Sequence, residues 1–294
     1  MMTRRFLPLV LAFLFVSVTA SRAAPRTPSK ASSKSSRDES SSAEGPSGIR
    51  AASYILVDAN TGVPMLTHNA DAQRAVASTQ KIITALVVVD HGDLDRRVTV
   101  KESDIDVEPT RLGVRAGDTY TVRELLYAFL VKSANDVAQV LARVTGGSQS
   151  GFAVMMNAKA RAMGMKDSYF INPHGLPAKG QYSTARDMAR AALLAYRTPV
   201  IRDAVGHKYL EFRYANGKTA RLENTNNLLG RMPECNGMKT GYTNAAGRCL
   251  LSSATANGRT VIAVQLGTKT KYIWEDGAIL MRWGLARASR GSLK

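Results

Sequence analysis

The chain has 294 residues, of which 45% are hydrophobic, and its 40 Lys and Arg residues outnumber its 23 Asp and Glu residues to give a net charge of +17. This length is enough for one large domain or two small ones, and the sequence lacks the repeated long apolar segments of a channel or transporter. A pI of about 10.1 raises nucleic acid as a partner. Because the basic residues are scattered and the N-terminus indicates export, we expect no nucleic-acid partner. A basic surface that makes peripheral contact with anionic cell-envelope polymers or lipid fits better.

The first 24 residues are typical of a secretory signal peptide. Arg4 and Arg5 precede an apolar run over 6–18, and small residues follow before residue 24. The run is short for a transmembrane helix, although an uncleaved N-terminal anchor is an alternative. In either case we expect the rest of the chain to be exported, to the periplasm or cell envelope of a bacterium.

Residues 25–48 are predicted to form a disordered, serine-rich linker. Nine of the 23 residues from Pro25 to Ser47 are serine, and the only non-polar side chains there are proline and alanine, which cannot build a core. We therefore expect residues 49–290 to form a single domain.

A β-hairpin is predicted at the start of this domain. Ser53 to Val57 and Val63 to His68 have the composition of strands, and the turn over 58–62 contains Asn and Gly. A helix follows from about Ser78 and ends at Gly92. Because this helix is apolar nearly all round, we expect it to be central and buried.

Helices dominate the middle of the chain, after short strands and loops over 98–117. Thr121 and Glu124 form a capping box that begins a helix ending near Val131. A further helix is expected to begin after Asn135 and to stop at Gly146-Gly147, and others are expected from Ser150 to Met163 and from Thr184 to Tyr196, the last ending before Pro199.

Strands return after residue 207. Residues 208–214 and 218–222 predict a hairpin with a type I′ turn at Asn216-Gly217. Three antiparallel strands are expected at 238–242, 247–254 and 260–266, before an amphipathic helix at 274–288. Helices thus interrupt a sheet whose strands come from both chain ends. This order predicts an α/β (α+β) fold, with an antiparallel sheet of about five strands, flanking helices and a mostly helical insertion.

The two cysteines, Cys235 and Cys249, have two interpretations. An oxidising compartment would permit a disulfide between them. Unpaired cysteine is also common in buried strands. The sequence leaves both alternatives open.

Ser78 and Lys81 are candidates for a nucleophile and its base. Serine is a poor nucleophile without an adjacent base, and residues three apart on a helix share a face, so the Lys81 amine can reach the Ser78 oxygen. Burial would lower the pKa of Lys81 and let it accept a proton near pH 7. The start of a helix also offers free N–H groups where an oxyanion would form. Alone, this spacing is more often a helix cap followed by an ordinary lysine.

Two further motifs could complete such a site. Ser133 and Asn135 lie on a short turn between two predicted helices. Lys239, Thr240 and Gly241 lie on a predicted strand, where the glycine would let a substrate backbone lie close. Each motif is weak alone, because the first pair could cap a helix and Lys239 could be a solvated edge residue. Their joint occurrence in this order favours a catalytic site.

In these motifs the sequence resembles the penicillin-recognising serine enzymes, and most closely the serine-type D-Ala-D-Ala carboxypeptidases, which are low-mass penicillin-binding proteins. The resemblance covers residues 50–290 and implies a β-lactamase/transpeptidase-like fold with a carboxypeptidase catalytic domain at 49–290. It rests on blocks that match the family in its order: VKSAND at 131–136, MGM at 163–165, NPHGL at 172–176, NTNNLL at 224–229 and GMKTGYT at 237–243.

The resemblance implies a reaction on peptidoglycan stem peptides. Ser78 would attack the carbonyl between the two terminal D-alanines and form an acyl-enzyme, while Lys81 takes its proton. Ser133 would relay that proton to the leaving D-alanine, and water would then release the shortened peptide. β-Lactam antibiotics would acylate Ser78 in the same way. No metal or other cofactor is implied.

The resemblance also implies how substrate is held. Asn135 would hold the substrate amide, and Lys239 and Thr240 would bind the terminal carboxylate, with Gly241 beside the substrate. The backbone N–H groups of Ser78 and Tyr242 would form the oxyanion hole.

The motifs leave alternatives to the favoured D,D-carboxypeptidase, and the sequence departs in places from the patterns of related enzymes. A D,D-endopeptidase of the same fold would carry the same motifs, and a penicillin-binding or wall-anchoring module could keep the fold without turnover. A class A β-lactamase would carry a Glu-x-x-Leu-Asn block after Asn135, so rapid penicillin hydrolysis is not expected here. The chain ends at Lys294 after its last predicted helix, so we expect the C-terminal β-domain and membrane-binding tail of many family members to be absent.

Overall fold

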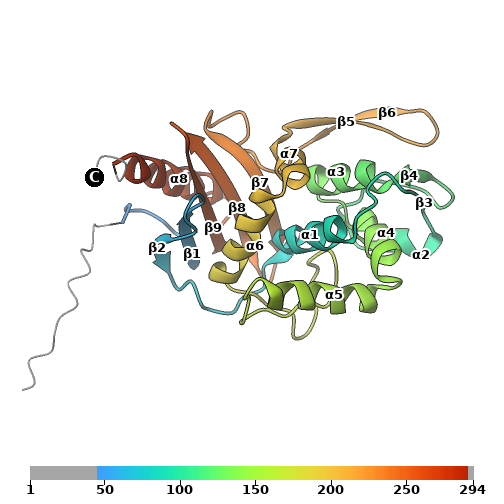
Figure 1. The fold of residues 1–294 in the computed structure, drawn as a ribbon, viewed down its shortest axis with the longest axis horizontal. Helices are drawn as coiled ribbons and strands as arrows, with labels where there is room; N and C mark the ends of the chain where they lie inside the picture. Colours follow the sequence, from blue (N-terminus) through green and yellow to red (C-terminus); the bar gives the residue numbers. More distant parts are fainter. Residues whose placement is uncertain (1–44, 291–294) are drawn as a thin grey trace, which may run out of the picture. The chain divides into compact units, whose positions relative to one another are not determined.

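The computed structural model describes residues 45–290, so the expected signal peptide and most of the expected linker lie outside the described residues. A five-stranded antiparallel sheet in the order β2-β1-β9-β8-β7 lies toward one side of the domain, at the left in Figure 1. Its strands are β1 (Ser53–Asp58), β2 (Pro64–His68), β7 (Cys235–Thr243), β8 (Gly247–Ala256) and β9 (Arg259–Thr268). The predicted sheet, with strands from both ends of the domain, is confirmed.

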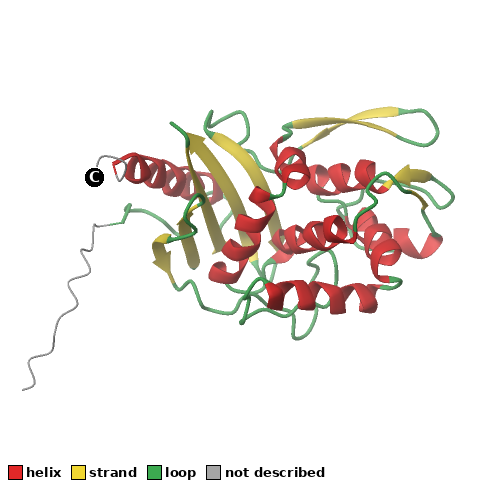
Figure 2. Ribbon diagram, in the orientation of Figure 1, coloured by secondary structure: helices red, strands yellow, loops and turns green. Residues whose placement is uncertain are grey.

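Helices cover both faces of this sheet. Successive side chains of a strand point to opposite faces, and Ile55 and Val57 accordingly belong to one hydrophobic cluster while Leu56 belongs to another. The helix α8 (Ile273–Arg290) packs on the Leu56 face, and α6 (Ala185–Arg197) packs on the other. Figure 2 shows these helices against the sheet.

The segment between β2 and β7 is mostly helical, as predicted. The short 3-10 helix η1 (Ala77–Gln80) continues into α1 (Lys81–His91), whose residues 81–88 are all buried. Around α1 pack α3 (Val122–Lys132), α4 (Asn135–Gly146) and α5 (Gln149–Ala162).

The predicted capping box is present at the start of α3. The backbone N–H of Glu124 donates to Thr121 Oγ1 (3.1 Å), and the backbone N–H of Thr121 donates to Glu124 Oε2 (2.7 Å). Two backbone donors at the helix start are thereby satisfied. This end of α3 is therefore defined by its own sequence.

Two short helices were not predicted, α2 (Glu102–Ile105) and α7 (Pro199–Gly206). The sequence pattern at Pro199 predicts only the end of α6. Proline also fits the first turn of a helix, where its missing N–H has no intrahelical partner, and α7 begins in this way. Of the short strands predicted over 98–117, the structure has β3 (Arg97–Thr99), and its antiparallel partner β4 (Thr119–Thr121) lies just beyond that range.

The predicted hairpin of β5 (Tyr209–Arg213) and β6 (Thr219–Glu223) is confirmed, but its turn is not type I′. That turn needs a positive φ at both central residues, and Asn216 has none, whereas Gly217 has a φ of 86°. Instead, the Gly217 N–H donates to Tyr214 O (2.9 Å). The connection is thus a three-residue loop whose last residue is the left-handed glycine.

The two cysteines are free and buried. Cys235 lies opposite Ala254 and Cys249 lies opposite Gly241, at the two ends of the β7–β8 pair. They also belong to the clusters on opposite faces of the sheet. The disulfide alternative is therefore not realised in this structure.

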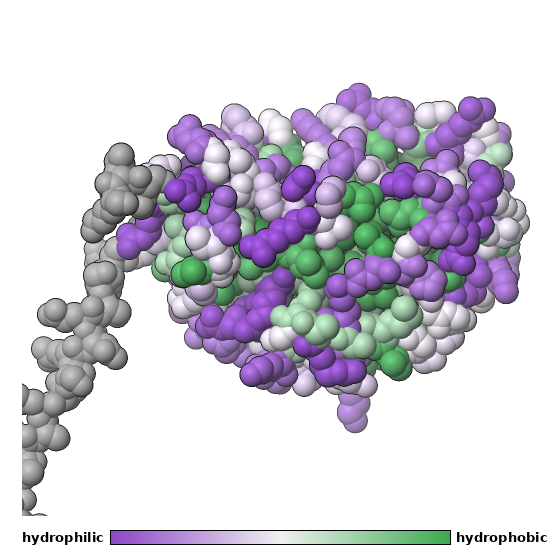
Figure 3. Space-filling model, in the orientation of Figure 1, coloured by the Kyte–Doolittle hydropathy of each residue, from purple (hydrophilic) through white to green (hydrophobic). Residues whose placement is uncertain are grey.

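The surface carries polar side chains throughout the face seen in Figure 3. Hydrophilic residues are distributed over this face, with apolar surface between them. No helix within residues 45–290 combines the length and the apolar character needed to cross a membrane.

Candidate active site

Ser78 lies in η1, directly before α1, and lines a cavity of about 350 Å³. Two glycines let other backbone segments approach η1. A Cβ on Gly175 would lie 2.2 Å from the carbonyl oxygen of Ala77, and a Cβ on Gly241 would lie 2.9 Å from the Ser78 nitrogen. Gly241 was expected to make room for a substrate backbone. In the structure it makes room for η1, so that β7 lies directly against the segment that carries Ser78.

The Lys81 amine is fully buried and has three oxygen partners. Its Nζ lies 2.8 Å from Ser78 Oγ, 2.7 Å from Asn135 Oδ1 and 2.6 Å from the carbonyl oxygen of His174. Ser78 Oγ also lies 3.2 Å from the same His174 oxygen. The three-residue spacing therefore brings the amine to the hydroxyl, as the sequence pattern predicted.

Burial and like charge shift the titration of three groups here. Burial lowers the pKa of Lys81 well below its ordinary value, and the charge of Lys239 lowers it further, whereas Asp136 acts in the opposite direction. Burial also lowers the pKa of Lys239, to about 7. The pKa of His174 falls to about 3 because of burial and, second, the charge of Lys81. A lysine with a lowered pKa can be neutral and accept a proton at neutral pH.

Ser133 and Asn135 lie where α3 ends and α4 begins, and both line the cavity. Ser133 has a left-handed backbone (φ 65°), a conformation that is uncommon for a residue other than glycine and concentrates at functional sites. Asn135 Nδ2 donates to the carbonyl oxygens of Glu108 (2.9 Å) and Pro109 (3.0 Å). Both of its amide hydrogens are thus used, so a substrate carbonyl at Nδ2 would have to replace one of these two oxygens.

The strand β7 carries Lys239, Thr240 and Gly241 along the edge of the sheet. Lys239 is almost fully buried, and its Nζ donates to the Thr240 carbonyl oxygen (3.1 Å). The Thr240 hydroxyl donates to Thr225 Oγ1 (2.6 Å), and both threonines line the cavity. Tyr242 also lines it, with an exposed side chain. Within residues 45–290 no group of three or more His, Cys, Asp or Glu side chains is placed to hold a metal ion.

Two contributors to this site, His174 and Thr225, were given no role by sequence reasoning. His174 contributes its backbone oxygen, which any residue type supplies, so its side chain carries no signal. Asn172 holds this loop, because its Oδ1 accepts from the Gly175 N–H (2.8 Å) and its Nδ2 donates to the Leu176 carbonyl oxygen (2.9 Å). The matching blocks at 172–176 and 224–229 were the available signal.

Comparison with known proteins gives a consistent family. A family model described as D-alanyl-D-alanine carboxypeptidase matches residues 39–270. The D-alanyl-D-alanine carboxypeptidase DacB2 of Mycobacterium tuberculosis is 34% identical over 252 residues, which are 83% of this chain and 86% of that protein. A D-alanyl-D-alanine endopeptidase of Pseudomonas aeruginosa is 33% identical over 289 residues, which are 96% of this chain and 89% of that protein. DacF of Bacillus subtilis, also a D-alanyl-D-alanine carboxypeptidase, is 34% identical, but the match spans only 58% of its length.

Solved structures agree with the sequence relatives. The Streptomyces K15 DD-transpeptidase superposes with a TM-score of 0.78 at 30% identity, over 83% of this chain and 99% of that one. A D-alanyl-D-alanine carboxypeptidase from Mycobacterium tuberculosis H37Rv superposes with a TM-score of 0.77 at 32% identity, over 83% of this chain and 92% of that one. The expected transpeptidase-like fold is therefore confirmed.

Proposed function

This chain belongs to the D-alanyl-D-alanine carboxypeptidase family of serine peptidases, and from that membership we propose that Ser78 is its nucleophile and Lys81 the base that activates it. The observation that carries the proposal is the 2.8 Å separation of Lys81 Nζ and Ser78 Oγ, in which the amine is fully buried and the serine is partly exposed on the cavity wall. A serine beside a base with a lowered pKa is the arrangement that nucleophilic catalysis needs.

The partners of Lys81 suit proton transfer. A neutral amine has two N–H groups, which can donate to Asn135 Oδ1 and the His174 oxygen, and one lone pair, which can accept the Ser78 hydroxyl proton. After transfer, the ammonium can donate to all three oxygens. Because no partner has to change, little reorganisation accompanies the step.

The bond that breaks is the amide between the last two D-alanines of a stem peptide. Ser78 Oγ bonds to the carbonyl carbon, the C–N bond breaks, and the leaving amine receives a proton through Ser133 on the cavity wall. Water then attacks the acyl-enzyme and frees the shortened peptide. A β-lactam would acylate the same oxygen.

The strand β7 also supplies groups that suit substrate binding, with Thr240 on the cavity wall and the buried Lys239 beside it. The Lys239 ammonium and the Thr240 hydroxyl would hold the terminal carboxylate by charge-assisted hydrogen bonds. The N–H groups of Ser78 and Tyr242 would stabilise the oxyanion. The close packing of Gly241 against the Ser78 nitrogen supports this pairing, because it brings the two backbone segments together.

We expect Ser78→Ala to lose both D-alanine release and covalent labelling by a fluorescent penicillin. The protein should stay folded, because the lost hydrogen bonds to Lys81 and His174 contribute only about 1 kcal/mol each. Gel fluorescence, D-alanine release from a synthetic peptide and a thermal melt check the three points. A covalent adduct on the alanine variant would place the nucleophile elsewhere, and labelling of wild type without release would favour a non-turnover binding module.

A D,D-endopeptidase is the second candidate, because the Pseudomonas aeruginosa endopeptidase matches nearly the whole chain. Both reactions cut a bond after D-alanine, so they can share the same catalytic groups. Purified cross-linked muropeptide dimers separate them. Monomers appearing from dimers would mark the endopeptidase, and free D-alanine from pentapeptides would mark the carboxypeptidase.

We place this activity outside the cytoplasm, in the periplasm or cell envelope. Residues 1–24 would direct export, 25–48 would act as a linker, and 49–290 would form the catalytic domain. The family's substrate, the cell wall, lies in that compartment. Mass spectrometry of the protein from the envelope fraction would give its mature N-terminus.

A further inference from the structure

Arg248 lines the same cavity from β8, the strand next to the edge strand β7. Its guanidinium lies over the Tyr242 ring, 4.3 Å from the ring centroid, and its Nε donates to Thr270 Oγ1 (3.1 Å). These contacts set the orientation of the guanidinium and leave the four hydrogens on its two Nη atoms for other acceptors. Within residues 45–290 no carboxylate lies within ion-pair distance of it. The cavity thus holds an oriented cation without an anionic partner from the described chain.

The direction in which the substrate peptide runs along β7 determines which part of the peptide lies near Arg248. This direction rests on the proposed function. If the terminal carboxylate lies at Lys239 and Thr240 and the cleaved carbonyl at the Tyr242 N–H, the peptide runs antiparallel to β7. The residues before the cleaved bond then pass Tyr242 toward Thr243 and the turn into β8. Arg248 is the residue paired with Tyr242 across these strands. It therefore lies on the acyl side of the cleaved bond, away from the carboxylate end.

The cavity wall on that side also carries apolar surface. Ile273 and Trp274, at the start of α8, line it, and Trp274 is half-buried. Apolar surface favours contact with methylene groups, and a guanidinium binds a carboxylate through two parallel hydrogen bonds. An aliphatic chain that ends in a carboxylate meets both requirements.

We propose that Arg248 is a specificity-determining residue, which binds a free carboxylate at the end of the side chain that immediately precedes the D-Ala-D-Ala unit. This anion site is separate from Lys239, which would bind the C-terminal carboxylate. A side chain that ends in an amide loses the charged contact, and one that ends in an amine places two cations together.

Three acetylated peptides that end in D-Ala-D-Ala test the proposal. They differ only in the preceding residue, which is 2-aminopimelic acid, its side-chain amide or lysine. We expect wild type to prefer the acid over the amide by about tenfold in kcat/KM, from one charge-assisted contact, and the amide over lysine. In Arg248→Gln the acid-to-amide ratio should fall close to one.

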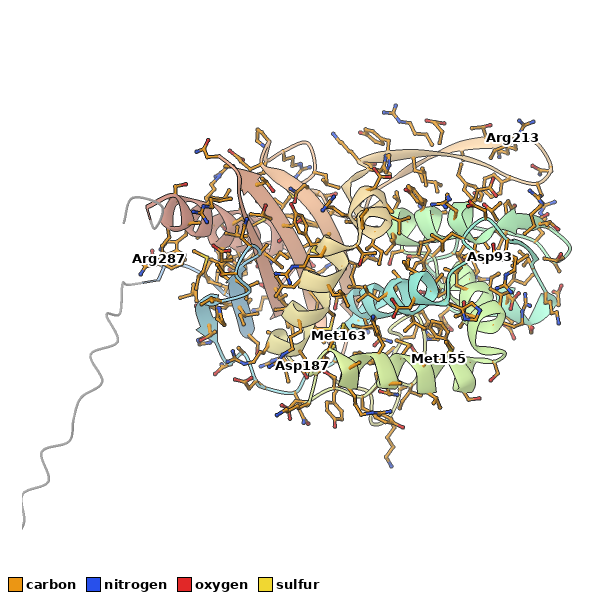
Figure 4. All side chains as sticks on the ribbon, viewed as in Figure 1. Asp93, Met155, Met163, Asp187, Arg213 and Arg287 are labelled. Carbon is orange, nitrogen blue, oxygen red and sulfur yellow. The ribbon has the colours of Figure 1, made fainter. Side chains whose placement is uncertain are left out.

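Arg213→Gln is the matched control. It removes one positive charge from an exposed arginine on the β5–β6 hairpin, away from the sheet (Figure 4), and should keep the wild-type ratio. A wild-type ratio near one, or a tenfold ratio that persists in Arg248→Gln, overturns the proposal.

A binding measurement separates this proposal from the proposed function. Calorimetry of the acid and amide peptides on Ser78→Ala, with and without Arg248→Gln, reports the preference without turnover. If the acid peptide binds better than the amide peptide only when Arg248 is present, while wild type releases no D-alanine, that combination would contradict the proposed peptidase activity and leave the role of Arg248 standing. Equal binding of the two peptides would overturn the role of Arg248.

Discussion

At the scale of single residues, Lys81 combines burial with three oxygen partners, and its proposed role depends on a neutral amine. We expect Lys81→Arg to acylate at least about a hundredfold more slowly, because a guanidinium stays protonated in proteins and cannot accept the Ser78 proton. Stopped-flow acylation with a fluorescent penicillin measures the rate. An arginine variant that keeps most of the wild-type rate would mean that the proton goes to another group.

The burial of Lys239 should reduce the free energy of unfolding at low pH. The pKa of Lys239 is about 7 in the folded protein against an ordinary value of 10.5. Between these values the unfolded chain binds more protons than the folded one, so the free energy of unfolding rises with pH in that window. Below about pH 7 the folded protein buries the charged form of Lys239, and the free energy of unfolding is reduced by the full cost of desolvating that charge.

We therefore expect Lys239→Met to melt higher than wild type, by about 3 °C or more at pH 6. The difference should shrink as pH rises from 7 toward 10.5. Thermal melts of both proteins across this range check it. A difference that is constant with pH would mean that packing, rather than the buried charge, separates the two proteins.

At the scale of elements, the approach of the 172–176 loop to η1 depends on Gly175. Its φ is 88°, and an added Cβ would lie 2.2 Å from the Ala77 oxygen. We expect Gly175→Ala to reduce kcat/KM by about a hundredfold, because η1 would have to move and carry Ser78 out of place.

Gly217→Ala is the control for this change. Gly217 has a similar φ of 86° in the β5–β6 loop, but no atom lies within 4 Å of its added Cβ. It should cost about 1 kcal/mol of stability from backbone strain, with little change in kcat/KM. Equal losses of activity in both variants would show that strain alone, rather than contact with η1, explains the effect.

Most elements could be predicted because their signals are local. The capping box of α3 and the alternation of the strands depend only on neighbouring residues. The turn before β6 was assigned wrongly because Asn216-Gly217 also occurs in longer loops, and strand register rather than the dipeptide decides between them. The helix α7 was missed because a proline signals both an end and a start.

In the candidate site, too, contacts between neighbouring residues could be predicted from the sequence and contacts between distant segments could not. Helical spacing predicts the contact between Ser78 and Lys81, but the spacing alone does not separate a catalytic pair from a helix cap followed by an ordinary lysine. The contact of Asn135 with the loop at 108–109 could not be predicted, because backbone carbonyls far along the chain have no sequence signature. The same holds for the His174 oxygen and for the approach of Gly241 to η1, which depend on how the sheet packs against the helices.

At the scale of the whole domain, Asp276 joins the segment before β1 to α8. Its carboxylate is fully buried and accepts from the Arg50 backbone N–H (3.0 Å) and the Arg50 guanidinium (2.8 Å). Glu275 also contacts Arg50 but its side chain is 59% exposed. Asp276→Ala should lower Tm by about 3–10 °C, whereas Glu275→Ala should change it by about 1 °C, as is usual for exposed ion pairs. Similar shifts in the two variants would show that burial of the carboxylate is unimportant.

The position of β7 at the edge of the sheet bears on how this protein avoids aggregation. A long open edge can pair with the edge of another copy. Here η1 packs against Gly241, and Val205 of α7 lies against Gly237, where an added Cβ would be 2.9 Å from its side chain. The part of the edge that remains open is therefore short. It also carries the buried Lys239, and an inward-facing charge is one of the features that discourage the addition of a foreign strand. The same stretch can thus admit a single peptide and still resist the growth of a shared sheet between molecules.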